Sequence, residues 1–411
     1  MSGARFDPAS TGLPAAGVMP ALLDALDREG RAVLIAPPGA GKTTLAPLAL
    51  MGAGWAAGKI LMLEPRRLAA RAAATRMADL IGEEIGRSVG YRLRGESRPG
   101  ARVEVVTEGI LTRMLQSDPA LDGVSAVIFD EFHERSLHAD LGLALTWEAR
   151  GALRPDLRIL VMSATLDADS VAALMDAAPV LRAEGRVFPV ETRWLDRPAG
   201  DAALAAAEAA RRALDADEGD ILVFLPGARE IARAAAALSD AGAEALPLHG
   251  GLSFARQRAA LAPTKGRKIV LATSIAETSL TVEGVRVVID AGLARRARFD
   301  PGAGMARLAT ERESKAEAEQ RRGRAGRLAP GVAYRLWTKG EEGAMAAFAP
   351  PEIMIADLAP LALELANWGA GPGDLSFLTP PPEAGMAAAR ALLADLGALD
   401  GAGRITAHGR A

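Results

Sequence analysis

Residues 36–44, Ala-Pro-Pro-Gly-Ala-Gly-Lys-Thr-Thr, have the types and spacing of a loop that binds phosphate. They follow an apolar, β-branched run and precede a helical pattern, an order that directs backbone N–H groups and a helix N-terminus at an anion. Lys42 is expected to reach the β- and γ-phosphates, and the Thr43 hydroxyl to bind Mg²⁺. Ala36 departs from the pattern, which has glycine there. The stretch predicts a nucleoside triphosphate site made by Gly39, Ala40, Gly41, Lys42, Thr43 and Thr44.

A second candidate motif follows the apolar run at residues 124–129, which ends in Asp130 and Glu131. A buried strand that places two carboxylates beside a phosphate loop supplies the groups for hydrolysis. Asp130 would hold Mg²⁺, directly or through water, and Glu131 would polarise the attacking water. Taken alone, Asp-Glu after a strand is an ordinary charged helix start, so the prediction depends on the pairing with the loop.

Further polar residues stand at the ends of other expected strands. Arg66 and Arg67 follow the run at 59–63 and are candidates for phosphate contacts to a nucleic acid, although a solvated helix start is the alternative. Thr107 opens a helix, where free N–H groups again suit a phosphate. The run at 158–162 leads to Ser-Ala-Thr165, whose hydroxyls are expected to form hydrogen bonds with the turn that carries Asp130 and Glu131, and so to transmit its state to other parts of the protein.

Residues 320–327, Gln-Arg-Arg-Gly-Arg-Ala-Gly-Arg, form a second basic candidate. The spaced arginines predict either a nucleic-acid patch or arginine fingers that neutralise a γ-phosphate. A solvated basic helix is the alternative reading.

The elements that would position these residues alternate between strand and helix, which predicts parallel sheets in an α/β fold. After a composition shift through residues 197–200, a second set of strands begins. Turn residues 299–304 predict an inserted hairpin. Helices followed by a short β-wing suggest a final winged-helix module. The expected domains are residues 1–195, 196–345 (with a hairpin at about 295–310) and 346–411.

Composition limits the function classes for this chain of 411 residues. Its net charge of −3 excludes a generally basic nucleic-acid binder, so any such site must be a local groove. The absence of cysteine excludes disulfides, thiolate zinc sites and cysteine nucleophiles. No signal-peptide layout or membrane span is evident, and we expect a soluble, cytoplasmic protein.

From about Leu13 to the end, the motifs resemble the DEAH-box helicases of superfamily 2, and within them the bacterial HrpB type. The resemblance rests on motifs in the family's order: residues 39–44, Gly-Ala-Gly-Lys-Thr-Thr; 64–71, Glu-Pro-Arg-Arg-Leu-Ala-Ala-Arg; 107–111, Thr-Glu-Gly-Ile-Leu; 130–133, Asp-Glu-Phe-His; 163–165, Ser-Ala-Thr; 224–227, Phe-Leu-Pro-Gly; 273–281, Thr-Ser-Ile-Ala-Glu-Thr-Ser-Leu-Thr; and 320–327.

The resemblance implies two tandem RecA-like parallel-sheet domains (P-loop NTPase) followed by a small winged-helix module, with ATP and Mg²⁺ bound between the RecA-like domains. It implies γ-phosphate contacts from Gln320, Arg324 and Arg327, adenine stacking by Arg76, and ordering of the water shell by Glu283. It assigns single-stranded RNA to Arg66, Arg67, Thr107, Gly227 and Thr273, and coupling between sites to His133, Ser163 and Thr165. The hairpin near Phe299 would act as a strand-separating or gating wedge.

The sequence departs from the family's pattern at three positions: Phe132 replaces alanine, Glu283 replaces a frequent aspartate, and Ile355 replaces a common arginine. The family's later ratchet and oligonucleotide-binding-fold domains have no counterpart in these residues.

The combined interpretation is a monomeric, ATP-dependent RNA helicase or translocase core that moves 3′ to 5′ if it is like its family. Two alternatives stay open: a nucleic-acid-stimulated ATPase that remodels ribonucleoprotein or acts on DNA without processive unwinding, and a nucleotide-gated scaffold. Lys42, Asp130, Glu131 and Arg324 argue against the scaffold, which would need none of them.

Overall fold

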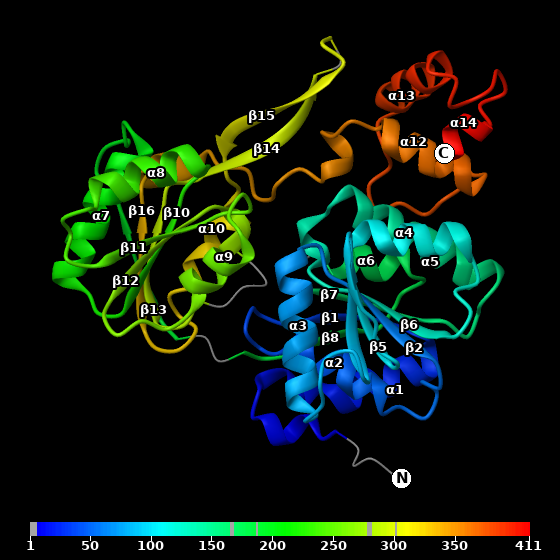
Figure 1. Cartoon of the computed structure of the whole chain (residues 1–411), viewed down its shortest axis with the longest axis horizontal. Coiled ribbons are helices and arrows are strands. Elements are labelled where there is room, and N and C mark those ends of the chain that lie inside the picture. The colour runs from blue at the N-terminus through cyan, green and yellow to red at the C-terminus, as the bar shows by residue number, and fades with distance from the viewer. Residues whose placement is uncertain (1–5, 165–167, 186–187, 278–281, 301) are drawn as a thin grey trace. The chain divides into compact units, whose positions relative to one another are not determined.

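The computed structural model describes residues 6–164, 168–185, 188–277, 282–300 and 302–411. The chain divides into two compact units (Figure 1). The first runs to Gly185 and also includes Arg298–Arg307 and Pro350–Ala411, and the second comprises Arg186–Ala297 and Leu308–Ala349.

The first unit is built on an eight-stranded sheet with the strand order β4-β3-β5-β2-β6-β7-β1-β8. Its strands are β1 (Arg31–Ile35), β2 (Lys59–Leu63), β3 (Val89–Leu93), β4 (Glu96–Arg98), β5 (Val103–Val106), β6 (Val124–Phe129), β7 (Arg158–Ser163) and β8 (Val180–Arg182). All neighbouring pairs are parallel except β3 with β4.

Helices cover both faces of this sheet because alternate strand residues are apolar on both sides. Ile60 and Met62 pack in a cluster with the first three helices, whereas Leu61 and Leu63 pack in a cluster with the next three. The helices are α1 (Met19–Glu29), α2 (Lys42–Met51), α3 (Arg67–Leu80), α4 (Glu108–Ser117), α5 (Leu137–Ala152) and α6 (Ala168–Leu174), with 3₁₀ turns η1 (Pro8–Thr11), η2 (Pro14–Val18) and η3 (Phe132–Glu134).

The second unit holds a six-stranded sheet in the order β11-β12-β10-β13-β16-β9, parallel throughout. Its strands are β9 (Val190–Trp194), β10 (Asp220–Phe224), β11 (Glu244–Leu248), β12 (Lys268–Ala272), β13 (Val285–Asp290) and β16 (Gly331–Arg335). Its helices are α7 (Ala202–Ala216), α8 (Ala228–Ala237), α9 (Phe254–Leu261), α10 (Lys315–Arg322) and α11 (Lys339–Gly343), with the 3₁₀ turn η4 (Ser274–Ala276).

Strand β9 lies before the expected boundary between residues 195 and 196, yet it pairs in parallel with β16 of the second sheet. An edge strand needs a neighbour for its backbone groups, and β16 supplies one. The second unit therefore starts earlier in the chain than the composition shift indicated.

Two further parts complete the chain. β14 (Leu293–Asp300) and β15 (Met305–Arg312) form a two-stranded sheet where the sequence indicated a hairpin. The C-terminal segment contains η5 (Glu352–Met354), α12 (Ala359–Trp368), α13 (Glu383–Asp395), α14 (Ala407–Arg410) and an isolated antiparallel bridge between Leu399 and Ile405. Leu361, Leu365 and Leu393 join the apolar cluster around α4 and α5.

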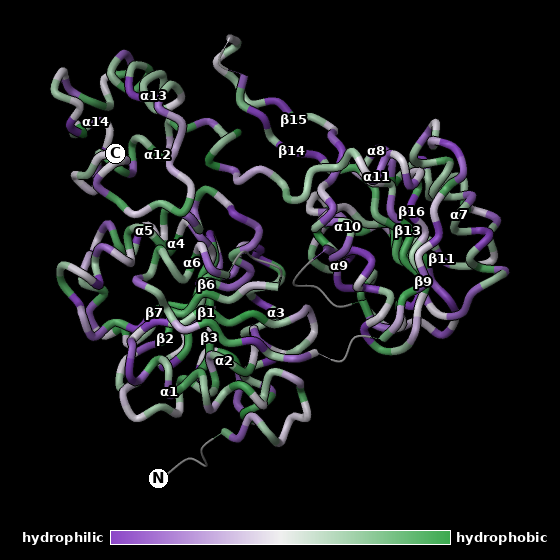
Figure 2. The backbone as a smooth tube through the Cα atoms, turned by 180° about the vertical axis from the view of Figure 1, so that it is seen from behind, coloured by the Kyte–Doolittle hydropathy of each residue, from purple (hydrophilic) through white to green (hydrophobic). Residues whose placement is uncertain are grey.

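The central strands of both sheets are the most hydrophobic stretches of the backbone, whereas the hairpin is largely hydrophilic (Figure 2). No helix in the described ranges is both long and apolar enough to cross a membrane. The expected α/β fold with two parallel-sheet domains is confirmed.

Candidate active site

Because the strands are parallel, the segments that follow β1, β2, β5, β6 and β7 meet at one edge of the first sheet. The phosphate loop follows β1, Asp130 follows β6, and Ser163 ends β7. Gly39 and Gly41 have φ values of +83° and +91°, a region that favours glycine. Parallel pairing thus brings together motifs that are far apart in the chain.

Ala36 fits its place in the loop. It is buried, it lacks the positive φ of the two loop glycines, and its N–H donates to the Ser163 carbonyl at 3.0 Å, which continues the ladder between β1 and β7. Its departure from the pattern of the loop therefore carries no backbone strain.

Lys42 is the first residue of α2 and is buried. Its Nζ donates to Glu131 Oε2 at 3.1 Å. Burial lowers the pKa of this ammonium, but the carboxylates of Glu131 and Asp130 outweigh that effect, and the pKa is raised overall. Lys42 is therefore a permanent cation at the start of a helix, where an anion is favoured.

Asp130 carries a buried carboxyl group whose two oxygens differ. Oδ1 accepts from the N–H of Glu131 at 2.9 Å, whereas Oδ2 has no hydrogen-bond partner among the described residues. Burial, and then the Glu131 charge, raise the Asp130 pKa to about 6 against the opposing effects of Lys42 and a hydrogen bond with Thr43. A buried carboxylate oxygen next to a threonine hydroxyl suits Mg²⁺, which takes few protein oxygens and completes its shell with water and phosphate.

No group of three or more His, Cys, Asp or Glu residues that could hold a metal ion occurs in the described ranges. A metal held by one carboxylate, one hydroxyl and a nucleotide does not require such a group.

The acidic turn itself is strained. Glu131 and Arg135, on either side of η3, both have left-handed backbones, with φ values of +49° and +48°. Non-glycine residues adopt this region only when the surrounding structure holds them there. The direction of the Glu131 carboxylate therefore depends on what holds the turn.

His133 lies between the acidic turn and the end of β7. Its Nδ1 accepts from the Ala164 N–H at 3.4 Å and lies 3.5 Å from Glu131 Oε2. Burial lowers its pKa, so the ring is neutral near pH 7. Because Nδ1 accepts a hydrogen bond, the proton of the neutral ring is assigned to Nε2. Ser163 is also buried, and Thr165 lies outside the described residues.

The predicted contact residues of the first unit differ in their surroundings. Arg66 forms an ion pair with Glu134 at 3.1 Å, so it is tied to the acidic turn. Arg67 and Arg76 are exposed on α3, and Thr107 precedes α4 without capping it by its side chain. Only Arg66 among them is held by an ion pair in the described part of the chain.

Gly227 and Thr273 both line a cavity of about 300 Å³ at the carboxyl edge of the second sheet. They share it with His249, Arg295 and Arg321. The turns after β10 and β12 therefore meet, as parallel pairing requires.

Gln320 lies in α10, while Arg324 and Arg327 follow in the turn after it. Arg324 is buried, and its Nε donates to the Glu277 carbonyl at 2.9 Å. Ser314 and Glu317 form a capping box that fixes the start of α10, as is typical of that pair.

Glu283 does not join these candidates. It lies in an exposed turn directly before β13, and the next residue, Gly284, accepts from the N–H of Asp220 at the start of β10. Gly227 follows the opposite end of β10. Glu277 and Glu283 therefore belong to opposite edges of the second sheet, which sequence spacing does not reveal.

Arg321 is a buried residue whose importance the sequence reasoning missed. Its guanidinium contacts Glu277 at 3.1 Å, Asp290 at 2.9 Å and also Glu313. Its place in the 320–327 motif was the available signal, but the sequence does not identify its carboxylate partners.

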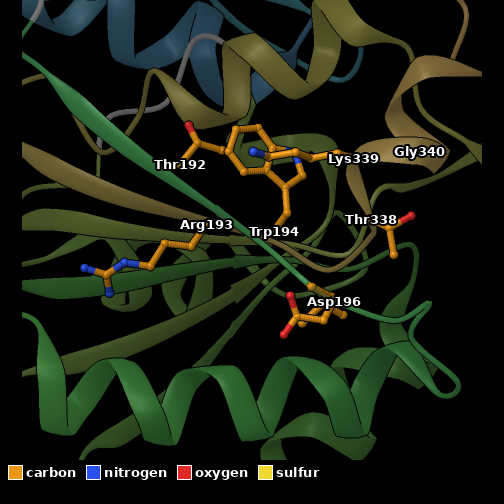
Figure 3. Close-up of a pocket in the computed structure, with 8 residues that line it drawn as sticks. Thr192, Arg193, Trp194, Asp196, Thr338, Lys339 and Gly340 are labelled. Atoms are coloured by element: carbon orange, nitrogen blue, oxygen red, sulfur yellow. The ribbon is translucent and has the colours of Figure 1, made fainter.

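A larger surface pocket of about 580 Å³ surrounds Trp194 on the second unit (Figure 3). The Lys339 ammonium lies 4.8 Å from the centre of the Trp194 ring, and the indole N–H donates to Glu342 at 2.5 Å. These contacts hold the edge strand β9 against the segment after β16, so we assign the pocket a structural role.

Comparison of this chain with known proteins shows similarity to helicase families. The model of the DEAD/DEAH box helicase family matches residues 16–174, and that of the helicase conserved C-terminal domain matches residues 205–329. The chain is 50% identical over 409 residues to the ATP-dependent RNA helicase HrpB of Escherichia coli, covering 97% of this chain and 50% of that protein.

The ATP-dependent RNA helicase HrpA of Escherichia coli is 36% identical over 392 residues, which cover 92% of this chain and 30% of HrpA. A crystal structure of the Escherichia coli DEAH/RHA helicase HrpB superimposes with a TM-score of 0.91 at 49% identity, over 97% of this chain and 52% of that one. The chain thus spans about half the length of HrpB and 30% of the length of HrpA.

Proposed function

The chain belongs to the DEAD/DEAH box helicases, and from that premise we propose that it is an ATP-dependent RNA helicase or translocase core. The observation that supports this most is the buried contact of Lys42 with Glu131, directly beside Asp130. One cation and two carboxylates with distinct surroundings provide a phosphate ligand, a metal ligand and a base. A scaffold that only bound nucleotide would not require the base.

Each residue of the site has a separate proposed task. Lys42 and the N–H groups of the loop bind the β- and γ-phosphates, and Asp130 with Thr43 holds Mg²⁺. When bound, Mg²⁺ neutralises phosphate charge. Lys42 turns from Glu131 to the phosphates, which frees the Glu131 carboxylate to orient water and accept its proton.

The remaining assignments are proposals of the same kind. Gln320, Arg324 and Arg327 act on the γ-phosphate, and Arg76 acts on the adenine, whereas the place of Glu283 at the opposite edge of the second sheet removes it from the proposed site. Single-stranded RNA contacts Arg66, Arg67, Thr107, Gly227 and Thr273, while His133, Ser163 and Thr165 link the two sites. Movement is 3′ to 5′, the C-terminal segment is a winged-helix module, and the protein is a cytoplasmic monomer.

ATP hydrolysis with and without single-stranded RNA, or DNA of equal length, tests this proposal. We expect RNA to stimulate hydrolysis and Lys42→Ala to abolish nucleotide binding or turnover. Glu131→Gln should bind ATP without turnover, because Glu131 acts only during chemistry. Glu148→Gln, a carboxylate of α5 that accepts from Trp368, is the matched control and should hydrolyse ATP normally.

Wild-type turnover in Glu131→Gln would overturn the assignment of the base. Stimulation by DNA alone would redirect the proposal to a DNA-dependent ATPase. Duplexes with a 3′ or a 5′ overhang test the direction of movement.

A further inference from the structure

Arg135, the residue that ends the acidic turn, is not among the residues assigned above. Its guanidinium donates to both carboxylate oxygens of Asp140, from Nε at 2.9 Å and from Nη2 at 3.0 Å. The same group lies over the ring of Phe132, 5.9 Å from its centre. Phe132 is buried and meets Phe129 edge-on at 6.3 Å. Arg135 therefore fastens the turn to α5 and to the core below it.

Arg135 also connects this turn to the C-terminal segment of the first unit. Its Nη2 donates to Thr379 Oγ1 at 2.9 Å, and its backbone carbonyl accepts from the N–H of Glu352 at 3.0 Å. Glu352 Oε2 in turn accepts from the N–H of Leu137 at 2.8 Å. Two separate stretches of the C-terminal segment are thus hydrogen-bonded around one residue of the acidic turn.

These contacts act on the backbone that orients Glu131. The turn from Glu131 to Arg135 is short and left-handed at both ends, so moving one end changes the direction of the other. Asp140 is buried, and its partner Arg135 is only 16% exposed, so the pair is largely shielded from water. A bidentate, shielded pair fixes geometry more tightly than a surface pair does.

We propose that Arg135 is a positioning residue for Glu131, and that through Thr379 it makes ATP hydrolysis depend on the seating of the C-terminal segment. A partner that displaced residues near Thr379 would release Arg135 and misdirect the Glu131 carboxylate. The inference rests on the proposed ATPase function. It adds a regulatory input to that site, from a part of the chain outside the nucleotide motifs.

Steady-state ATPase kinetics of Arg135→Ala and Arg135→Lys test the positioning role. We expect kcat of Arg135→Ala to fall about tenfold or more with little change in KM for ATP, because a small misplacement of a reacting group affects chemistry more than binding. Arg135→Lys keeps a positive charge beside Asp140 but loses the two parallel hydrogen bonds of the guanidinium group. It should therefore keep only part of the wild-type kcat. Binding of a fluorescent ADP should be unchanged in both.

Arg154→Ala is the matched control. Arg154 also forms a two-contact pair with an aspartate, Asp156, and is 18% exposed, but it donates to backbone carbonyls before β6 and at its first residue. It should lower thermal stability without the loss of kcat. Equal kcat losses in Arg154→Ala and Arg135→Ala would show a general stability effect and overturn the proposal.

Thr379→Val tests the link to the C-terminal segment, because it keeps the side-chain shape and removes only the hydroxyl. We expect kcat to fall severalfold, and to fall no further when Thr379→Val is added to Arg135→Ala, since both remove one interaction. Wild-type kcat in Thr379→Val, or additive losses in the double variant, would overturn the link. If Arg135→Ala does not fold, Arg135→Lys and Thr379→Val decide the matter.

The two levels of the proposal fail in different ways. A wild-type chain that does not hydrolyse ATP contradicts the proposed function. An active wild-type chain whose Arg135 variants keep full kcat contradicts only the positioning role.

Discussion

The charges around Lys42 are unbalanced, since Asp130 and Glu131 both lie beside this one buried cation. Desolvation and the neighbouring carboxylate make an ionised Asp130 costly, as its raised pKa of about 6 reflects. Mg²⁺ bound at Oδ2 would supply the missing positive charge. An ionised Asp130 therefore lowers the stability of the fold at the position where a metal ligand is needed.

We predict that Asp130→Asn is more heat-stable than the wild type at pH 8, without nucleotide or Mg²⁺. The folded pKa of about 6 lies above the ordinary 3.8, so between these values the folded state holds a proton that the unfolded state has released. The contribution of Asp130 to the free energy of unfolding is thus fully present at low pH and is lost as the pH rises through the folded pKa. Replacing the acid removes this loss.

Thermal unfolding from pH 4 to pH 8 checks the prediction. The difference in Tm between Asp130→Asn and the wild type should be largest at pH 8 and shrink toward pH 4. A lower Tm for Asp130→Asn at pH 8 would contradict the sign of the argument.

A second prediction at this scale concerns Arg324. Its replacement by alanine should slow ATP hydrolysis by about 10³-fold or more, the scale of an arginine finger, with a far smaller change in ATP affinity. Single-turnover hydrolysis and nucleotide binding separate the two effects. Loss of RNA binding alone, with RNA-free hydrolysis intact, would instead make Arg324 a contact to the nucleic-acid backbone.

At the scale of elements, Arg321 of α10 forms ion pairs with carboxylates from three separate segments of the chain. Asp290 ends β13, Glu313 follows β15, and Glu277 follows η4. Burial strongly raises the pKa of Glu313 despite the Arg321 charge. Burial alone would lower the pKa of Arg321, but the charges of the carboxylates around it outweigh this effect and raise that pKa. The N–H of Glu313 donates to the Gly292 carbonyl at 3.1 Å, so this network closes the base of the hairpin.

We predict that Arg321→Met destabilises the protein by about 3–5 kcal/mol, because it leaves buried carboxylates without a counter-charge. Urea unfolding at pH 8 measures the loss, which should diminish at lower pH as the carboxylates bind protons. Arg322→Ala is the matched control, because Arg322 is the next residue in the chain and its side chain pairs with the half-exposed Glu319. A loss no larger than that of the control would refute the role of the network.

At the scale of the whole molecule, a net charge of −3 means that attraction for nucleic acid comes from local groups. Arg67 is an exposed candidate for that task at the carboxyl edge of the first sheet. Few phosphates can be neutralised by so few arginines. Binding should therefore be weak and strongly dependent on salt.

We predict that the logarithm of the affinity for single-stranded RNA falls against log salt with a slope of roughly 0.7 per phosphate contact. Arg67→Ala should reduce the slope by about one contact, because it removes one released counterion. Fluorescence anisotropy across a salt series measures both. Arg28 is exposed on α1 and pairs with Asp24, so Arg28→Ala should leave the slope unchanged. An equal effect of Arg28→Ala would refute a localised groove.

The sequence by itself determined the features that depend on local pattern. Apolar runs located strands such as β2 and β6, and the glycine spacing of residues 36–44 located the phosphate loop before α2. Alternation of strand and helix determined parallel sheets, because a parallel pair requires a crossover. Parallel pairing then brings the ends of β1, β6 and β7 to one edge, so the nucleotide site could be predicted.

Only the tertiary structure decided which side chains meet across the chain. Arg135 and Thr379 lie 244 positions apart, and Lys42 and Glu131 lie 89 apart. It also placed β9 in the second sheet and Glu283 at the far edge from Gly227. Contacts between residues so far apart in the sequence depend on the path of the whole backbone and on which charged side chains become buried and lose their water. The local spacing of residues determines neither of these.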